Sequence, residues 1–321
     1  IGDGDRFCPR AVREGHCFNS AGRAGPDIGA LQQRVTVAPG ETAELVVLVG
    51  YGKDKADIAR LKTKYGSPAK AARAFKTLRA TWDEYLGRMT VNLPDHDLTT
   101  FANGFNRYGM YIRYYTRYGF RDTAQDIGSL FPFDAERGRR RLERLLIAQL
   151  QSGHCMHEID HFRFPNPISV NSDKALWLPW ATAAYLKETG DWAFLKKTYE
   201  FHDGGKGSVY EHLTRAIDYI LRESGRFGLP LLKVGDWNDC LSGSPEKGVS
   251  VWMAEFLYIG LNEMIEIARR SGCKDDARRF EKEAKRIRET VNKNCWDGQW
   301  YVRAFDEDGR PIGSKSNREG K

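Results

Sequence analysis

The chain has 321 residues, of which 41% are hydrophobic and 12% aromatic, so it has enough apolar surface for a folded core and is not a disordered polypeptide. Its 50 lysines and arginines outnumber 43 acidic residues, and the net charge of +7 favours the approach of a small anionic substrate such as phosphate. No window of about 18 apolar residues exists, so we expect neither a membrane-spanning helix nor a membrane partner.

The beginning of the chain carries no address that we recognise. It starts at Ile1 rather than methionine, and it lacks the basic start and apolar run of a signal peptide. The 6 cysteines include no CxxC pair, which favours reduced thiols over a zinc ribbon or a disulfide framework. We therefore expect a cytoplasmic protein whose N-terminal part is missing from this sequence.

The N-terminal part is predicted to change from strand to helix. In residues 1–51, two apolar segments flank the turn sequence "APGE" and predict a β-hairpin. Residues 52–93 have helical spacing and form a predicted linker, with Ser67 as an N-cap and Pro68 at the first helical position.

Residues 94–321 are predicted to form long helices separated by irregular loops, so the fold is expected to be mainly α. Gly272 should end one helix as a C-cap, and Asp308 with Gly309 should form the turn of a short closing hairpin. Paired helices whose long loops are rich in Trp, Asp, Gly and Arg resemble an α/α toroid. We place the helices near residues 97–118, 135–151, 174–188, 208–223, 249–271 and 274–293.

Two other clusters suggest partners that we do not favour. The basic segment 137–145 has leucines at helical spacing on one side, which indicates a solvated helix face rather than a nucleic-acid site. A histidine-rich segment lacks the HExxH arrangement, so hydrogen-bonded loop histidines are a better interpretation than a metal site. Its members are His154, Cys155, His157, Asp160 and His161.

The segment "GDWNDC" contains two carboxylates, Asp236 and Asp239, around Trp237 and Asn238. Cleavage of a sugar bond needs an acid that protonates the leaving oxygen, and a neighbouring tryptophan favours a protonated carboxyl while offering a flat face to a sugar ring. Asp239 is our candidate acid. The alternative is an ordinary turn in which Asp and Asn side chains satisfy backbone groups.

Two further segments contain polar groups suited to a sugar. "GFRDTAQD" places Arg121 beside Asp122, with Asp126 one helical turn later, so donors and acceptors for hydroxyl groups lie together. The alternative is a structural salt-bridge cluster. "NSDKALWLPW" has a Ser-Asp pair that is expected to cap a helix, and this helix carries Trp177 and Trp180 either as core residues or as ligand contacts.

These three segments, in this order, resemble the inverting glycoside phosphorylases of the cellobiose and chitobiose phosphorylase type, glycoside hydrolase family 94. The family shares "GFRD…QD", "SDD.LWLP…Y…TGD" and "DWND", and the segments "EHLTRAIDYI" and "WDGQWYVRAFDEDGRPIGS" are similar as well. The resemblance implies the end of a β-sandwich in residues 1–51, a helical linker in 52–93 and the first half of an (α/α)6 catalytic barrel in 94–321.

The resemblance also implies roles for individual residues. Phosphate would cleave a β-glycosidic bond with inversion, Asp239 would be the general acid, and no metal or organic cofactor would take part besides phosphate as co-substrate. The sugar-binding residues would be Arg121, Asp122, Asp126, Trp237 and Asn238. Family members are often homodimers, so the resemblance suggests the same option here.

Three departures from the family pattern qualify this interpretation. The segment before "GFRD" is shorter than usual, and Arg117 or Arg113 would have to replace the family's phosphate-binding arginine. Lys174 stands where the family has a second aspartate. The sequence also ends before the barrel half that normally supplies further phosphate ligands, which implies a fragment.

The leading interpretation is therefore a phosphorylase that acts on a β-linked gluco-disaccharide or short oligosaccharide and releases an α-sugar 1-phosphate. Two candidates share the fold: the phosphorylase-like domain of a cyclic β-1,2-glucan synthase, and an inverting hydrolase, which would need a second carboxylate. A candidate of another class is an inactive fragment that only binds carbohydrate.

Overall fold

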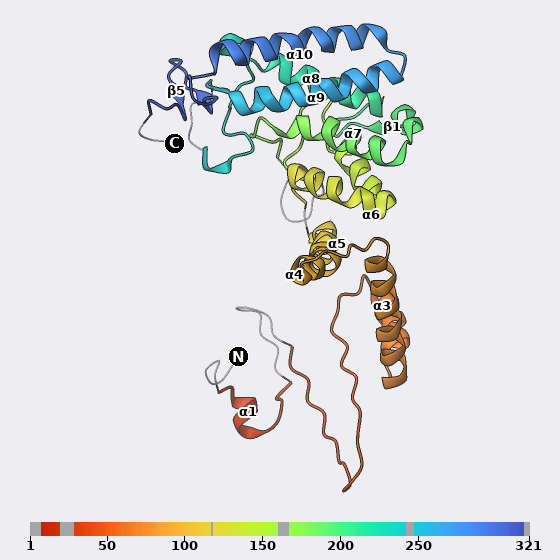
Figure 1. Cartoon of the computed structure of the whole chain (residues 1–321). Helices are drawn as coiled ribbons and strands as arrows, with labels where there is room; N and C mark the ends of the chain where they lie inside the picture. Colours follow the sequence, from red (N-terminus) through yellow and green to blue (C-terminus); the bar gives the residue numbers. More distant parts are fainter. Residues whose placement is uncertain (1–7, 20–28, 117, 160–166, 242–246, 318–321) are drawn as a thin grey trace. The chain divides into compact units, whose positions relative to one another are not determined.

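The computed structural model describes residues 8–19, 29–116, 118–159, 167–241 and 247–317. The chain divides into two compact units, Ile1–Tyr85 and Leu86–Lys321, and Figure 1 follows both along the sequence. No helix within the described ranges combines the length and apolarity needed to cross a membrane.

The regular elements in the described part of the first unit are helices, and the predicted hairpin is only partly present. The turn forms, because the Glu41 amide donates to the Ala38 carbonyl at 3.0 Å. The flanking segments are extended but do not pair as strands, so the strand prediction is wrong for the described residues. Leu45, Val47 and Val49 are exposed there. A two-stranded hairpin is marginal without a packing surface, which explains the difference.

Both linker helices begin at a capping side chain, and the cap of the second was predicted. Asp54 caps α2 (Lys55–Tyr65) by accepting a hydrogen bond from the Asp57 amide. Pro68 begins α3 (Pro68–Gly87), and the Ser67 hydroxyl lies 3.4 Å from the Lys70 amide that it caps. The predicted N-cap and first helical position are confirmed. A short helix, α1 (Arg10–Glu14), precedes them.

The second unit is built from stacked helices, and a mainly α fold is confirmed. Helix α6 packs along α7, and α9 packs along α10, as Figure 1 shows. The α-helices are α4 (His96–Thr100), α5 (Asn106–Thr116), α6 (Phe120–Ile147), α7 (Trp177–Thr189), α8 (Val209–Arg222), α9 (Val251–Arg270) and α10 (Lys274–Asn294). A π-helical turn η1 (Phe101–Phe105) joins α4 to α5, and the 3₁₀ turns are η2 (Lys174–Leu176), η3 (Trp192–Lys196), η4 (Arg226–Gly228) and η5 (Asp239–Leu241).

Two small antiparallel sheets close the loops between helices. Strands β1 (Thr198–Glu200) and β2 (Lys206–Ser208) pair before α8. Strands β3 (Val249–Ser250), β4 (Ala304–Phe305) and β5 (Pro311–Ile312) lie in that order in the second sheet. The β4–β5 hairpin turns at the predicted Gly309, whose φ is +85°. This sheet joins the start of α9 to the segment after α10.

Helix α6 begins earlier than the sequence suggested. We expected a helix near 135–151, but it starts at Phe120, so the "GFRD" segment forms its first turn. The early turns bury Phe120, Ala124 and Ile127, whose spacing is that of one helix face. The polar residues between them obscured this pattern. Asp134 has non-helical dihedral angles two residues after Pro132, which bends the helix there.

The core lies between the stacked helices. Their apolar faces supply the fully buried side chains. The basic surface of α6 is only partly solvated, because Arg140 is 54% exposed but Arg137 is 20% exposed and packs on the Tyr111 and Tyr114 rings. Arginines on that surface pair with glutamates one turn away, for example Arg139 with Glu143 at 2.7 Å. The largest fully buried side chains include Phe120, Phe194, Phe280, Leu142, Leu145, Leu146, Leu176, Leu186, Leu213 and Ile217.

Gly153 lies where a side chain would clash with neighbouring backbone. Gly153 has φ +90°, and a Cβ atom there would lie 2.0 Å from the Arg215 carbonyl oxygen. We expect Gly153→Ala to lower the free energy of unfolding by about 2–4 kcal/mol, since strain and a clash with rigid backbone add together. Gly272→Ala is the control, because Gly272 has φ +78° but a Cβ atom there would have no atom within 4 Å. It should cost about 1 kcal/mol. Urea denaturation measures both, and equal losses would contradict the clash.

Candidate active site

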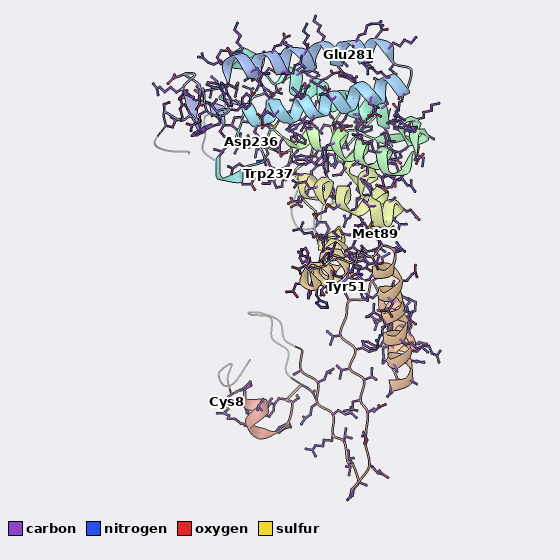
Figure 2. All side chains as sticks on the ribbon, in the orientation of Figure 1. Cys8, Tyr51, Met89, Asp236, Trp237 and Glu281 are labelled. Carbon is purple, nitrogen blue, oxygen red and sulfur yellow. The ribbon has the colours of Figure 1, made fainter. Side chains whose placement is uncertain are left out.

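The "GDWNDC" segment forms a loop that ends in η5 (Asp239–Leu241). Figure 2 labels Asp236 and Trp237 on it, below α9 in this view. The structure places its two carboxylates in opposite environments, since the Asp236 side chain is 0% exposed and the Asp239 side chain is 73% exposed. Spacing in the sequence did not reveal this difference.

Asp236 is a buried anchor for the loop. Its Oδ1 atom accepts a hydrogen bond from the Asn238 amide at 2.9 Å, and its Oδ2 atom accepts one from the Ser250 hydroxyl at 2.6 Å. Arg303 forms an ion pair with Oδ1. A buried carboxylate with a cation and hydrogen-bond donors is a stable arrangement, so the loop is fixed at this residue.

Arg121, on the first turn of α6, joins the separate motifs. Its Nη2 atom donates to Asp239 Oδ1 at 2.9 Å, and its Nη1 atom donates to the Asp236 carbonyl oxygen at 3.0 Å. Nη1 also lies 3.3 Å from Asp173 Oδ2. Burial alone would lower the pKa of Arg121, but Asp173 and then Asp239 outweigh it, and the pKa is raised. The guanidinium is therefore a permanent cation.

Asp173 is a buried ion-pair partner of Arg121. Its side chain is 0% exposed, and its Oδ2 atom accepts a hydrogen bond from Trp177 Nε1 at 2.8 Å. Its other oxygen, Oδ1, is buried without a hydrogen-bond partner in the described part of the chain. Burial raises the pKa of Asp173, although Arg121 acts in the opposite direction. The sequence suggested that Asp173 helps to cap the next helix, but its side chain forms no capping hydrogen bond.

Lys174, the departure from the family pattern, is a buried cation beside this group. Its Nζ atom lies 2.8 Å from His157 Nδ1 and donates to the His157 carbonyl oxygen at 3.1 Å. The Phe120 amide donates to that same carbonyl at 3.1 Å. Lys174 thus ties the 154–159 segment to the start of α6, where Arg121 lies. Burial lowers the pKa of Lys174 to about 8 and also lowers that of His157.

The remaining predicted sugar-binding residues are less closely grouped. Asp126 pairs with Arg113 of α5 at 2.9 Å rather than with Arg121. The Asp122 carboxylate lies close to the helix start. A Cβ atom built on Gly119 would be 2.3 Å from Asp122 Oδ2. Arg117, the candidate phosphate ligand, lies outside the described residues. The roles of Asp122, Asp126 and Arg117 stay predictions.

Trp237 and Asp239 both face solvent on the loop. The Trp237 side chain is 49% exposed, and its ring centre lies 6.3 Å from that of Trp252 at an angle of 31°. One face is thereby supported while the ring stays accessible, as a stacking platform for a pyranose requires. Asp239 does not have the apolar surroundings that we expected from its tryptophan neighbour, because it is exposed and bound to Arg121.

The histidine cluster serves the fold where it is described. His154 Nε2 lies 2.7 Å from the Ser169 carbonyl oxygen, and its ring stacks on Tyr219 at 4.5 Å. Asp160 and His161 lie outside the described residues. Within the described part of the chain, no group of three or more His, Cys, Asp or Glu side chains is arranged to hold a metal ion.

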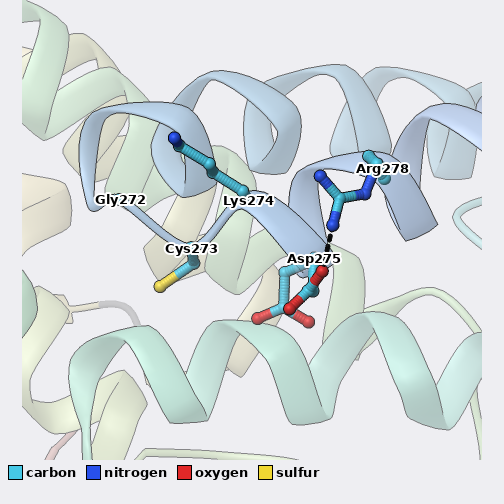
Figure 3. Close-up of a pocket in the computed structure, with 6 residues that line it drawn as sticks. Gly272, Cys273, Lys274, Asp275 and Arg278 are labelled. Carbon is cyan, nitrogen blue, oxygen red and sulfur yellow. Dashed lines mark hydrogen bonds and ion pairs between the residues drawn. The ribbon is translucent and has the colours of Figure 1, made fainter.

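A cavity of about 530 Å³ lies at the turn between α9 and α10, away from these motifs in the sequence. Figure 3 shows Arg278 paired with Asp275 across it. The second carboxylate there, Asp276, pairs with Arg279 at 3.2 Å, so both acidic side chains already have partners one helical turn away. None of the motif residues lines the cavity. We do not assign a substrate to it.

The fold and the site together define a class: a helical protein whose loops bring an arginine, a tryptophan and an exposed carboxylate together. Family comparison then identifies the group. The model of the glycosyl hydrolase 94 superfamily catalytic domain matches residues 81–321, and the model of the glycosyl hydrolase 94 supersandwich domain matches residues 1–68. The chain belongs to the glycosyl hydrolase 94 superfamily, and its helices form part of the (α/α)6 barrel of that family.

Individual relatives agree with this assignment. The chain is 30% identical to N,N'-diacetylchitobiose phosphorylase of Vibrio proteolyticus, over 99% of this chain and 44% of the relative. It is 32% identical to solabiose phosphorylase of Paenibacillus borealis, over 99% and 42%. It is 26% identical to the cyclic β-(1,2)-glucan synthase NdvB of Rhizobium meliloti, over 98% and 12%. The chain thus spans less than half of the length of these relatives.

The buried lysine predicts a pH dependence of stability. In the unfolded chain the Lys174 pKa returns to 10.5, so between about pH 8 and 10.5 the unfolded state binds more protons than the folded state. The contribution of Lys174 to the free energy of unfolding should therefore rise over this window. Relative to Lys174→Met, we expect a gain of about 1–2 kcal/mol. Urea denaturation of both proteins at the two ends of the window measures it, and a constant difference would contradict the assignment.

Proposed function

We propose that this chain carries the proton donor and sugar-binding residues of an inverting glycoside phosphorylase. The substrate would be a β-linked gluco-disaccharide or short oligosaccharide, and the products an α-sugar 1-phosphate and a shortened acceptor. The observation that carries the proposal is the contact of Arg121 with Asp239, because it unites the "GFRD" and "DWND" segments around an exposed carboxylate. The phosphorylases among the relatives support the reaction class.

In the proposed reaction, a phosphate oxygen attacks the anomeric carbon from the face opposite the glycosidic bond. The bond from that carbon to the glycosidic oxygen breaks, and the departing oxygen takes a proton from the Asp239 carboxyl group. Inversion converts the β-linkage into an α-phosphate. Phosphate is already an anionic nucleophile, so no second protein carboxylate is required, and the proposal includes no metal or organic cofactor.

The protein residues have separate parts in this scheme. Arg121 is held on one side by Asp173 and the Asp236 carbonyl, which leaves its Nη2 atom directed at Asp239. Sugar hydroxyl groups that accept from Arg121 would replace this ion pair and leave the Asp239 carboxyl group free to contact the glycosidic oxygen. Trp237 would stack on the sugar ring. We also propose that the protein forms a homodimer and is located in the cytoplasm.

A second candidate function has weaker support, from the match to a cyclic glucan synthase that is 26% identical over 98% of this chain. In that case the barrel would process β-1,2-linked glucan chains rather than disaccharides. An inverting hydrolase and a carbohydrate-binding domain without turnover complete the set of candidate functions. Phosphate separates them, because a phosphorylase requires it, a hydrolase does not, and a binding domain releases no product.

The test is release of sugar 1-phosphate from cellobiose, chitobiose, laminaribiose and β-1,2-glucan, with and without inorganic phosphate. The assay uses the full-length product of the gene, which includes residues 1–321. We expect phosphate-dependent release of an α-sugar 1-phosphate. Release of free sugar without phosphate would point to a hydrolase, and no release from any substrate would contradict the proposed reaction.

Asp239→Asn tests the proton donor. An amide keeps the size of the carboxyl group but cannot donate a proton to the leaving oxygen, so kcat should fall about 10³-fold. Sugar binding, measured by calorimetry, should change little. Asp308→Asn, an exposed carboxylate in the β4–β5 turn, is the control and should keep full activity. Wild-type turnover by Asp239→Asn would exclude it as the acid.

A further inference from the structure

We infer that Arg303 is a positioning residue, which acts through the buried carboxylate of Asp236 to hold the loop that carries Trp237 and Asp239. Arg303 lies outside the "GDWNDC" segment, on the backbone that leads into β4. The inference concerns the geometry of the loop, and it rests on the proposed function only for its effect on turnover.

The first step is the burial of Asp236. The side chain is 0% exposed, and the described donors to it are the Asn238 amide, the Ser250 hydroxyl and the Arg303 guanidinium. Of these described donors, only Arg303 carries a charge. Without it, a desolvated carboxylate would have two neutral donors, and the loop would have to move towards water to relieve it.

The second step is the role of Ser250, which connects the same group to α9. Its hydroxyl oxygen accepts from the Met253 amide at 3.0 Å, as the N-cap of α9, and from Arg303 Nη1 at 3.2 Å. Its hydrogen is donated to Asp236 Oδ2. The hydroxyl group thus uses its one donor and both acceptor positions, so the orientation of this network is fixed.

The third step is the rigidity of Arg303 itself. Its amide donates to the Ile312 carbonyl at 2.8 Å, and its carbonyl accepts from the Val251 amide at 3.2 Å. The backbone is therefore held between β5 and the start of α9. Its guanidinium carbon also lies 5.9 Å from the ring centre of Trp252, which supports Trp237. The Arg303 side chain therefore lies against both Asp236, which anchors the loop, and Trp252, the aromatic neighbour of Trp237.

The connection to the candidate site runs through one residue. The side chain of Asp236 binds Arg303, and its carbonyl oxygen accepts from Arg121, which holds Asp239. A shift of Asp236 therefore moves an acceptor of Arg121 and the three loop residues that follow it, Trp237 to Asp239. Since proton donation requires placement to within a fraction of an ångström, such a shift should reduce the rate.

The test measures the loop directly by amide hydrogen–deuterium exchange. In Arg303→Met, the Asn238 amide should exchange at least about tenfold faster than in the wild type, because its acceptor is no longer held in place, while the amides of α9 and α10 keep their protection. Arg310→Met is the matched control, because Arg310 lies in the same hairpin but forms an exposed pair with Asp308 at 3.3 Å. It should leave the Asn238 exchange rate unchanged.

Two results would overturn the inference: an unchanged Asn238 exchange rate in Arg303→Met, or an equal increase throughout α9 and α10. If Arg303→Met does not fold, Arg303→Lys replaces it. An ammonium group can pair with Asp236 but cannot also reach Ser250 in the same bidentate manner. Its Asn238 exchange rate should exceed that of the wild type, and a wild-type rate would overturn the inference.

Turnover gives the second readout. With phosphate and the preferred disaccharide, Arg303→Met should lower kcat at least about tenfold, since the proton donor loses its fixed position. Arg303→Lys should restore part of it, and Arg310→Met should match the wild type. A wild-type kcat in Arg303→Met would overturn the catalytic part of the inference. If the wild type has no turnover, the proposed function fails, and the exchange experiment still decides whether Arg303 positions the loop.

Discussion

The site depends on one guanidinium group. Arg121 lies at the start of α6, yet its hydrogen bonds reach Asp173 before η2 and both Asp236 and Asp239 on the loop. Segments that are more than a hundred residues apart in the chain are therefore joined by a single planar donor. A guanidinium can serve three acceptors at fixed angles, which a lysine cannot. The identity of this residue is therefore a geometric requirement.

Around Arg121, the protein separates its carboxylates by burial. Asp173 and Asp236 are fully buried, and each is held by an arginine and neutral donors, Trp177 for the first and Ser250 for the second. Such pairs stabilise the fold little but are costly to break, so they specify one arrangement rather than add free energy. Asp239, the exposed carboxylate, is left as the group that can exchange partners.

The sequence predicted most helices because their apolar faces follow helical spacing, as in α9 and α10, and because the Ser67 cap is a local signal. The predicted C-cap Gly272 lies one residue beyond the observed C-cap, Ser271. The sequence also located the motifs, since each is a contiguous segment. It did not predict the start of α6, where polar residues interrupt the apolar pattern, or the unpaired segments beside Gly40, which depend on a packing surface. The roles of Arg303 and Lys174 arise from contacts distant in sequence, and no spacing rule contains them.

The contact between Arg121 and Asp239 also changes the argument about the proton donor. The sequence suggested that a tryptophan would keep the acid protonated, but the structure places a cation beside an exposed carboxylate instead. In the proposed reaction, sugar hydroxyl groups that accept from Arg121 would compete with Asp239 for this donor, and the sugar would cover the carboxylate. The proposed proton donor would thus leave its ion pair only in the complex, where a leaving oxygen is present.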